Sequence, residues 1–150
     1  MTRYLLDTGI AQDFINYRHG VRERVDDERH LGHRIGICVP VLGELWAGIE
    51  GSSSRGRNEI RLRGALSRLV VWPYTNEAAA YFGRIFAELR RIGRPMQQID
   101  IQIAAIAFSL GNCTVVSADS DLCRCPGIDR RKLGLVRPDA NVRLGLSTNP

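Results

Sequence analysis

Short apolar runs alternate along the chain with longer stretches in which apolar residues recur every three or four positions. The short runs predict β-strands at Tyr4–Leu6, Ile35–Val39, Val70–Pro73 and Thr114–Ser117. The helical spacing predicts helices over Ile10–Ile15, Pro40–Ile49, Asn58–Leu69, Asn76–Ile92 and Ile99–Leu110. Strands that alternate with helices are typical of a parallel sheet covered on both faces. The expected fold class is therefore α/β, a three-layer α/β/α sandwich around a central, mainly parallel sheet.

Other segments give weaker patterns. Arg18–Arg34 is crowded with charge and indicates an exposed helix or a mobile segment, and Leu133–Val136 is a candidate last strand. Asn76 is expected to cap the longest helix. The buried stripe expected on that helix consists of Ala78, Phe82, Ile85, Phe86, Leu89 and Ile92. A chain of 150 residues fits one domain, expected at residues 1–137 with a polar tail at 138–150.

Four carboxylates stand where an apolar run ends or a predicted helix begins. Asp7 follows the first strand, Glu44 and Asp100 lie near helix starts, and Asp119 follows the fourth strand. Ligands of parallel sheets gather at the carboxyl ends of the strands, so the four acids are expected to share one pocket. Without a cation they would repel one another and some would be protonated. A hard divalent metal, Mg²⁺ with Mn²⁺ as the alternative, would instead use them as oxygen ligands.

Such a metal pocket suits phosphodiester hydrolysis. One or two ions would activate a water and stabilise the leaving oxygen. A metal-activated water needs no side-chain nucleophile. This fits the sequence, which has no Gly-x-Ser-x-Gly elbow and no Walker phosphate loop. Thr8 and Ser117 are supplementary candidates because each offers a hydroxyl beside an acid. Asp121 is a further candidate because it lies two residues after Asp119.

Each acid taken singly also has an ordinary structural explanation. Asp7 can belong to a strand-end turn, Asp119 can cap a turn, and first-turn acids such as Glu44 and Asp100 complement a helix dipole. Four such coincidences are less expected than one. Glu44 and Asp100 also lie in apolar stretches, where an unpaired charge is costly.

The charge balance favours an anionic partner. The chain has 21 Lys+Arg against 16 Asp+Glu, a net charge of +5, and Lys132 is its only lysine. Arginine holds phosphate oxygens in a bidentate fork, so a nucleic acid is the expected partner. A solvated basic surface without a partner is the alternative.

The cysteines and the hydropathy limit the remaining classes. The amino terminus has no signal-peptide core, so the thiols are expected to be reduced and the protein cytoplasmic. Cys123 and Cys125 have no second ligand pair at zinc-site spacing. No apolar run approaches the roughly 18 residues of a membrane span, so no membrane contact is expected.

The ordered motifs resemble the PIN domain, particularly the VapC toxins of bacterial toxin–antitoxin pairs. The resemblance runs from about Tyr4 to Val136. The motifs are Tyr4–Thr8, Val39–Leu45, Ile99–Ala107 and Val115–Leu122, supported by Ala87–Pro95 and Pro126–Ile128. Each motif alone is weak, whereas the ordered set is specific.

The resemblance implies a Mg²⁺-dependent endoribonuclease that cleaves structured cellular RNA, often transfer or ribosomal RNA. Its site residues would be Asp7, Glu44, Asp100 and Asp119, with Asp121 as a supplement. It also implies a homodimer, and a small antitoxin protein that wraps the toxin and blocks the site.

The chain departs from the family pattern at three positions. Gly9 stands where the family commonly has Asn, and it supplies no side-chain hydrogen bond beside Asp7. Ser117 stands where Thr is common and keeps the hydroxyl. Leu122 stands where Phe is frequent, which changes packing more than chemistry.

Three other functions compete with the nuclease. A haloacid-dehalogenase-like phosphatase needs a second acid two residues after the first, where this chain has Gly9. A receiver domain needs an acid after a middle strand, and Val70–Pro73 offers none. The third is a PIN-like module that binds RNA or protein with weak or no catalysis, for which Gly9 is the one hint.

Overall fold

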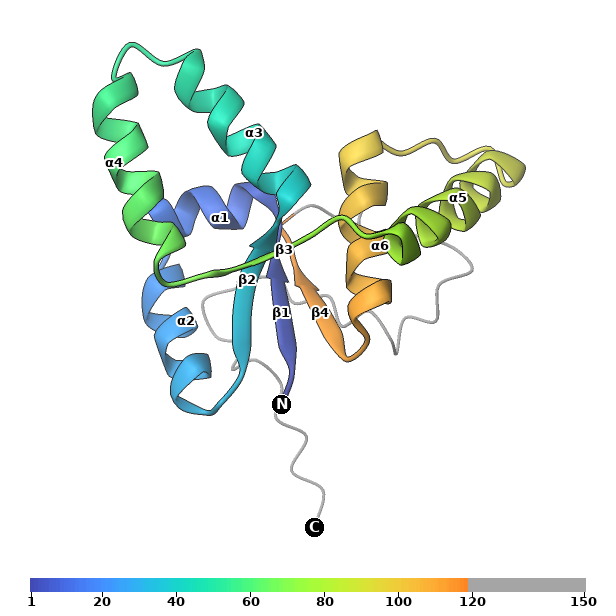
Figure 1. Ribbon diagram of the computed structural model, residues 1–150, viewed down its shortest axis with the longest axis horizontal. Helices are drawn as coiled ribbons and strands as arrows, with labels where there is room; N and C mark the ends of the chain where they lie inside the picture. The colour runs from blue at the N-terminus through green and yellow to red at the C-terminus, as the bar shows by residue number, and fades with distance from the viewer. Residues whose placement is uncertain (119–150) are drawn as a thin grey trace.

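The computed structural model describes residues 1–118, and within them the sheet has four parallel strands. These are β1 (Arg3–Leu6), β2 (Arg34–Cys38), β3 (Val70–Trp72) and β4 (Cys113–Val116), in the order β3-β2-β1-β4 (Figure 1). The four strands predicted for this part of the chain are confirmed to within one residue at each end. The predicted strand Leu133–Val136 and the domain boundary at residue 137 lie outside the described residues.

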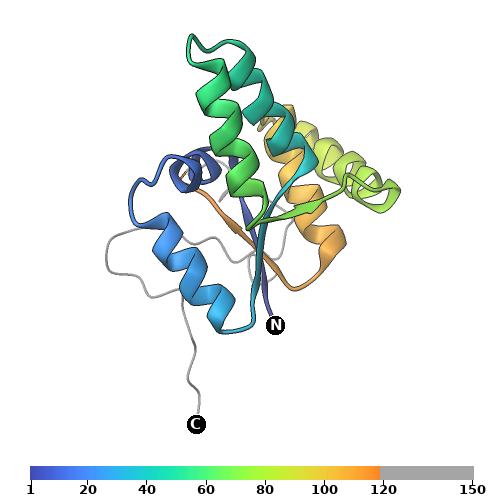
Figure 2. The same cartoon turned by 60° about the vertical axis from the view of Figure 1, so that its left-hand side comes forward.

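Six helices accompany these strands: α1 (Thr8–Ile15), α2 (Val21–His30), α3 (Val39–Glu50), α4 (Arg55–Leu66), α5 (Asn76–Arg91) and α6 (Gln98–Leu110). Figures 1 and 2 both place α2 and α5 on opposite sides of the sheet. The α/β sandwich with a parallel sheet is therefore confirmed. The charged segment that indicated an exposed helix or a mobile segment forms α2. None of the helices in residues 1–118 is long and apolar enough to cross a membrane.

The core of the described residues has two parts, one around the sheet and one between α5 and α6. The larger part includes Phe14 of α1, Ile37 of β2 and Leu62 of α4, all essentially without solvent contact. The smaller part joins Leu89 of α5 to Ala105 of α6. Because α6 packs against the sheet on one side and α5 on the other, its sequence is apolar almost all round.

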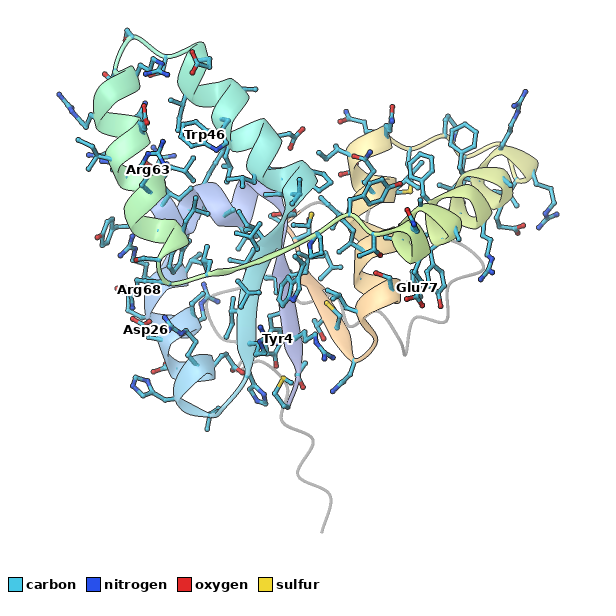
Figure 3. All side chains as sticks on the ribbon, viewed as in Figure 1. Tyr4, Asp26, Trp46, Arg63, Arg68 and Glu77 are labelled. Atoms are coloured by element: carbon cyan, nitrogen blue, oxygen red, sulfur yellow. The ribbon has the colours of Figure 1, made fainter. Side chains whose placement is uncertain are left out.

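An ion pair fastens the outer helices of the larger part. Asp26 of α2 pairs with Arg68, which follows α4 (Figure 3). Arg63 of α4 lies over the ring of Trp46 in α3, with its guanidinium carbon 5.2 Å from the ring centre. These contacts link α2 to the end of α4, and α4 to α3.

Three details of the predicted helices are wrong. Thr75, not Asn76, caps α5, because the Thr75 hydroxyl accepts the backbone N–H of Ala78 at 3.1 Å. Phe86 is 47% exposed and is not part of the buried stripe. The buried face of α5 carries Ala78, Ile85 and Leu89 instead. Ile60, expected on the apolar face of its helix, is 74% exposed.

A glycine permits the close contact between β2 and β3. Gly36 lies opposite Val70 in the register of these strands. A Cβ atom added at Gly36 would lie 2.0 Å from the carbonyl oxygen of Val70, which no side chain tolerates. Glycine is thus required at this strand position for steric reasons.

Candidate active site

Three helices begin at the carboxyl edge of the sheet. α1 follows β1, and α3 follows β2, without an intervening loop of any length. Only Gly111 and Asn112 separate the end of α6 from the start of β4, so the chain reverses direction between them. The helix therefore ends beside the start of β4 and begins at the edge where β4 ends. The backbone N–H of Asp7 donates to the carbonyl oxygen of Val116 at 3.1 Å, which joins the ends of β1 and β4. This edge is where ligands of parallel sheets bind.

Asp7 is buried at this edge, with 8% of its surface exposed. It is the N-cap of α1, and its Oδ1 accepts the backbone N–H of Ile10 at 2.9 Å. The sequence suggested a separate turn at Thr8 and Gly9, but the helix begins at once, at Thr8. The amino terminus of a helix favours negative charge, so the carboxylate is both oriented and electrostatically supported.

Glu44 is joined to this helix by a side-chain hydrogen bond. The hydroxyl of Thr8, the residue after Asp7, donates to Oε2 of Glu44 in α3. Glu44 is exposed, so the expectation that it has apolar surroundings is wrong. The reason is that α3 buries a different face, which carries Val41 and Leu45. The sequence places the Thr8 hydroxyl beside Asp7, and no sequence signal indicates Glu44 as its partner.

Asp100 lies in the first turn of α6 and is half-buried. Its helix places it at the carboxyl edge together with Asp7 and Glu44. Ser117 follows β4 directly and is 1% exposed. Asp119 and Asp121 lie outside the described residues, so the convergence of all four acids stays a prediction.

The ligand chemistry of this edge fits a hard divalent cation, although the acids are not gathered into a complete cluster. Within residues 1–118, no group of three or more His, Cys, Asp or Glu side chains is arranged to hold a metal ion. Carboxylate oxygens are the ligands that Mg²⁺ and Mn²⁺ prefer. The nearby thiol of Cys38 does not compete, because burial, with a smaller contribution from Glu44, raises its pKa to about 11. It is therefore protonated at neutral pH and a poor ligand.

A basic surface covers α4. Arg55 pairs with Glu50 at 2.8 Å, and Arg63 pairs with Glu59 at 2.9 Å. Arg57 and Arg61, one helical turn apart, are exposed and have no ion pair within the described part of the chain. Exposed guanidinium groups at helical spacing suit contacts with phosphate.

Known proteins resemble this chain over most of its length. The PIN domain model matches residues 4–128. The tRNA(fMet)-specific endonuclease VapC of Salmonella typhimurium is 36% identical over 129 residues, which cover 85% of this chain and 96% of the relative. Ribonuclease VapC2 of Haemophilus influenzae is 35% identical over 114 residues, which cover 74% of this chain and 83% of the relative.

Solved structures support the same assignment. A chain in the crystal structure of DNA-bound VapBC from Salmonella typhimurium matches with a TM-score of 0.80 and 31% identity, covering 93% of this chain and 100% of the other. VapBC2 from Rickettsia felis, bound to a DNA fragment from its promoter, matches with a TM-score of 0.80 and 26% identity, covering 91% and 98%. The resemblance noted in the sequence is confirmed: the chain belongs to the PIN domain family, among its VapC-type members.

Proposed function

We propose that this chain is a divalent-metal-dependent endoribonuclease and the toxin of a type II, VapBC-like toxin–antitoxin pair. The observation that carries the proposal is the buried Asp7 carboxylate at the start of α1, with Glu44 held beside it by Thr8. The relatives named as VapC ribonucleases support RNA as the substrate.

The metal would be Mg²⁺, with Mn²⁺ as the alternative. Asp7, Glu44 and Asp100 would hold it together with Asp119, and Asp121 would supplement them. When bound, the metal would activate the attacking water and stabilise the leaving oxygen of the phosphodiester. The amino terminus of α1 keeps the Asp7 carboxylate oriented. The Ser117 hydroxyl is proposed to hold Asp119.

The substrate proposed is structured cellular RNA in the cytoplasm, with transfer RNA as the first candidate because one relative is named for it. Exposed arginines such as Arg57 and Arg61 would attract phosphates generally. The acidic edge would then admit a phosphodiester through the metal. The basic surface and the acidic edge thus have separate roles in binding and in cleavage.

The partners proposed are a VapB-like antitoxin and a second copy of the chain. Similarity to chains in VapBC complexes supports the antitoxin. Co-expression with a short reading frame beside the gene should yield a co-purifying complex that no longer cleaves RNA. Purification of both proteins as separate species would contradict the antitoxin, and a monomeric mass in light scattering would contradict the homodimer.

The deciding experiment compares two acids in first helical turns. Asp100 and Glu77 both lie in the first turn of a helix, α6 and α5, so both complement a helix dipole (Figure 3 labels Glu77). Purified protein is incubated with transfer RNA and Mg²⁺, Mn²⁺ or EDTA. Asp100→Asn should lower the cleavage rate by about 100-fold or more, as expected for a lost metal ligand. Glu77→Gln should leave the rate unchanged. Cleavage that survives EDTA, or equal effects of both substitutions, would reject the metal mechanism.

The second candidate function is a PIN-like module that binds RNA or protein with little catalysis. One observation favours it: Gly9, beside Asp7, offers no side-chain hydrogen bond where the family commonly has Asn. The same incubation separates the two functions. A gel shift with RNA that is intact after prolonged incubation with either metal would favour the binding module.

A further inference from the structure

One hydroxyl links two helices at the carboxyl edge of the sheet. Thr8 is the first residue of α1, directly after the cap Asp7, and its Oγ1 donates to Oε2 of Glu44 in α3. Within the part of the chain that the structure describes, the Glu44 side chain has no other hydrogen bond or ion pair. Thr8 is therefore its one side-chain anchor there.

The anchor matters because the two acids differ in surroundings. Asp7 is buried and already fixed by the N–H of Ile10. Glu44 is exposed and has a longer side chain, so ordering it costs conformational entropy. Thr8 is a rigid donor, because β-branching restricts its side chain and its backbone lies in a capped helical turn.

We propose that Thr8 is a positioning residue that orders the Glu44 carboxylate beside Asp7 before a divalent cation binds. The inference rests on the proposed metal-dependent nuclease and deepens it. Each acid is then oriented by a different donor. The amino terminus of α1 orients Asp7, and the Thr8 hydroxyl orients Glu44. A preordered ligand binds a metal more tightly because less entropy is lost on binding.

A simpler role for the same hydrogen bond is mechanical. α1 and α3 pack against each other, and the Thr8–Glu44 bond is one connection between them. A purely mechanical bond would contribute to stability and would have no effect on metal affinity. The two roles are thus separated by measuring stability and metal affinity on the same variants.

The test is isothermal titration calorimetry of RNA-free protein with Mn²⁺ and with Mg²⁺. Thr8→Val keeps the shape and removes the hydroxyl, and it should weaken Mn²⁺ binding by about tenfold. Thr8→Ser keeps the hydroxyl and should stay within about threefold of wild type. Thr75→Val is the matched control: it removes the hydroxyl that caps α5, so it should lower the melting temperature and leave Mn²⁺ affinity unchanged.

A double-mutant cycle separates positioning from general damage. If Thr8 acts through Glu44, Thr8→Val should have no further effect on Mn²⁺ affinity in a Glu44→Ala background. A full tenfold effect in that background, or wild-type affinity in Thr8→Val, would overturn the inference while leaving the proposed function intact. Absence of saturable Mn²⁺ binding by the wild-type protein would overturn both. Failure of Thr8→Ser to restore affinity would likewise reject a role for the hydroxyl.

Discussion

The two ends of the parallel sheet use their polar groups in different ways. At the amino end, donors meet acceptors: the backbone N–H of Thr2 donates to Nδ1 of His33 at 3.1 Å, and the Asn112 amide donates to the Met1 carbonyl at 2.8 Å. At the carboxyl end, acidic side chains lie at or near helix starts: α1 supports Asp7 through the N–H of Ile10, and Thr8 donates to Glu44. Polar groups at the first end join segments of the chain. Those at the second end are proposed to bind an external ligand.

The contrast predicts that the two ends separate stability from activity. Substitutions at the amino end should lower the free energy of unfolding without changing RNA cleavage. Substitutions of acids at the carboxyl end should lower RNA cleavage and change the free energy of unfolding little, because a carboxylate that serves as a metal ligand contributes to metal binding more than to packing.

The largest effect is expected from Asp7→Asn. Asparagine caps a helix about as well as aspartate, so the melting temperature should change little. The lost negative charge should lower metal-dependent cleavage by about 100-fold or more. Single-turnover RNA cleavage and thermal melts on the same preparation check both parts. A variant that melts far below wild type would show that Asp7 serves mainly the fold.

Alkaline pH should lower the free energy of unfolding through Cys113, at the amino end of the sheet. Burial raises the pKa of this thiol from 9.0 to about 12, and nearby Arg3 only partly offsets the effect. Because the folded pKa is raised, this stabilisation is complete below pH 9 and is lost as the pH rises toward 12. Wild type should lose about 2 to 3 kcal/mol more than Cys113→Ala between pH 8 and 11. Urea unfolding at each pH measures the difference. Parallel curves for the two proteins would contradict it.

A smaller effect is expected from His33→Phe at the amino end. Phenylalanine keeps the edge contact with the Tyr4 ring, whose centre lies 5.7 Å from that of His33, but it cannot accept the Thr2 N–H. The unmet donor should cost about 1 to 2 kcal/mol in urea unfolding. Cleavage by the folded protein should be unchanged. A loss of cleavage without a loss of stability would contradict the assignment of the amino end to stability alone.

The smallest effect is expected at Gly9, beside Asp7. Among the described residues, a Cβ atom there would meet Oδ1 of Asp7, at an ordinary 3.8 Å. Gly9→Ala should therefore stabilise the protein by about 0.5 to 1 kcal/mol, because it restricts the unfolded chain within a helical turn. Gly9→Asn restores the residue common in the family and should raise cleavage about two- to fivefold, the worth of one hydrogen bond. Lower stability in Gly9→Ala would indicate a steric conflict at the site.

Local sequence signals predicted the strands and helices well. They were weaker where adjacent residues suit the same position, or where packing decides which helix face is buried. Apolar runs identified the strands, and helical spacing identified α3, α5 and α6. Thr75 and Asn76 both suit a helix cap, and composition does not decide between neighbours. Phe86 and Ile60 match a helical stripe, yet their exposure depends on which face meets another helix.

The sequence predicts candidate members of the site, and it does not predict the contacts between them. The positions of Asp7 and Asp100 follow from strand ends and helix starts, which are local. The exposure of Glu44 depends on the packing of α3, and the Thr8–Glu44 bond joins residues 36 positions apart. A single sequence contains no signal for such a pair.

The central place of β1 fixes when the site can be completed. β1 is synthesised before β4, one of its neighbours in the sheet, and Leu6 pairs with Val116, which comes 110 positions later in the chain. At translation rates of about 5 to 20 residues per second, the nascent chain waits on the order of 5 to 20 seconds for that partner. During this interval Asp7 lacks its hydrogen bond to Val116. A ribosome therefore releases most of this chain before the chain can assemble an edge able to cut RNA.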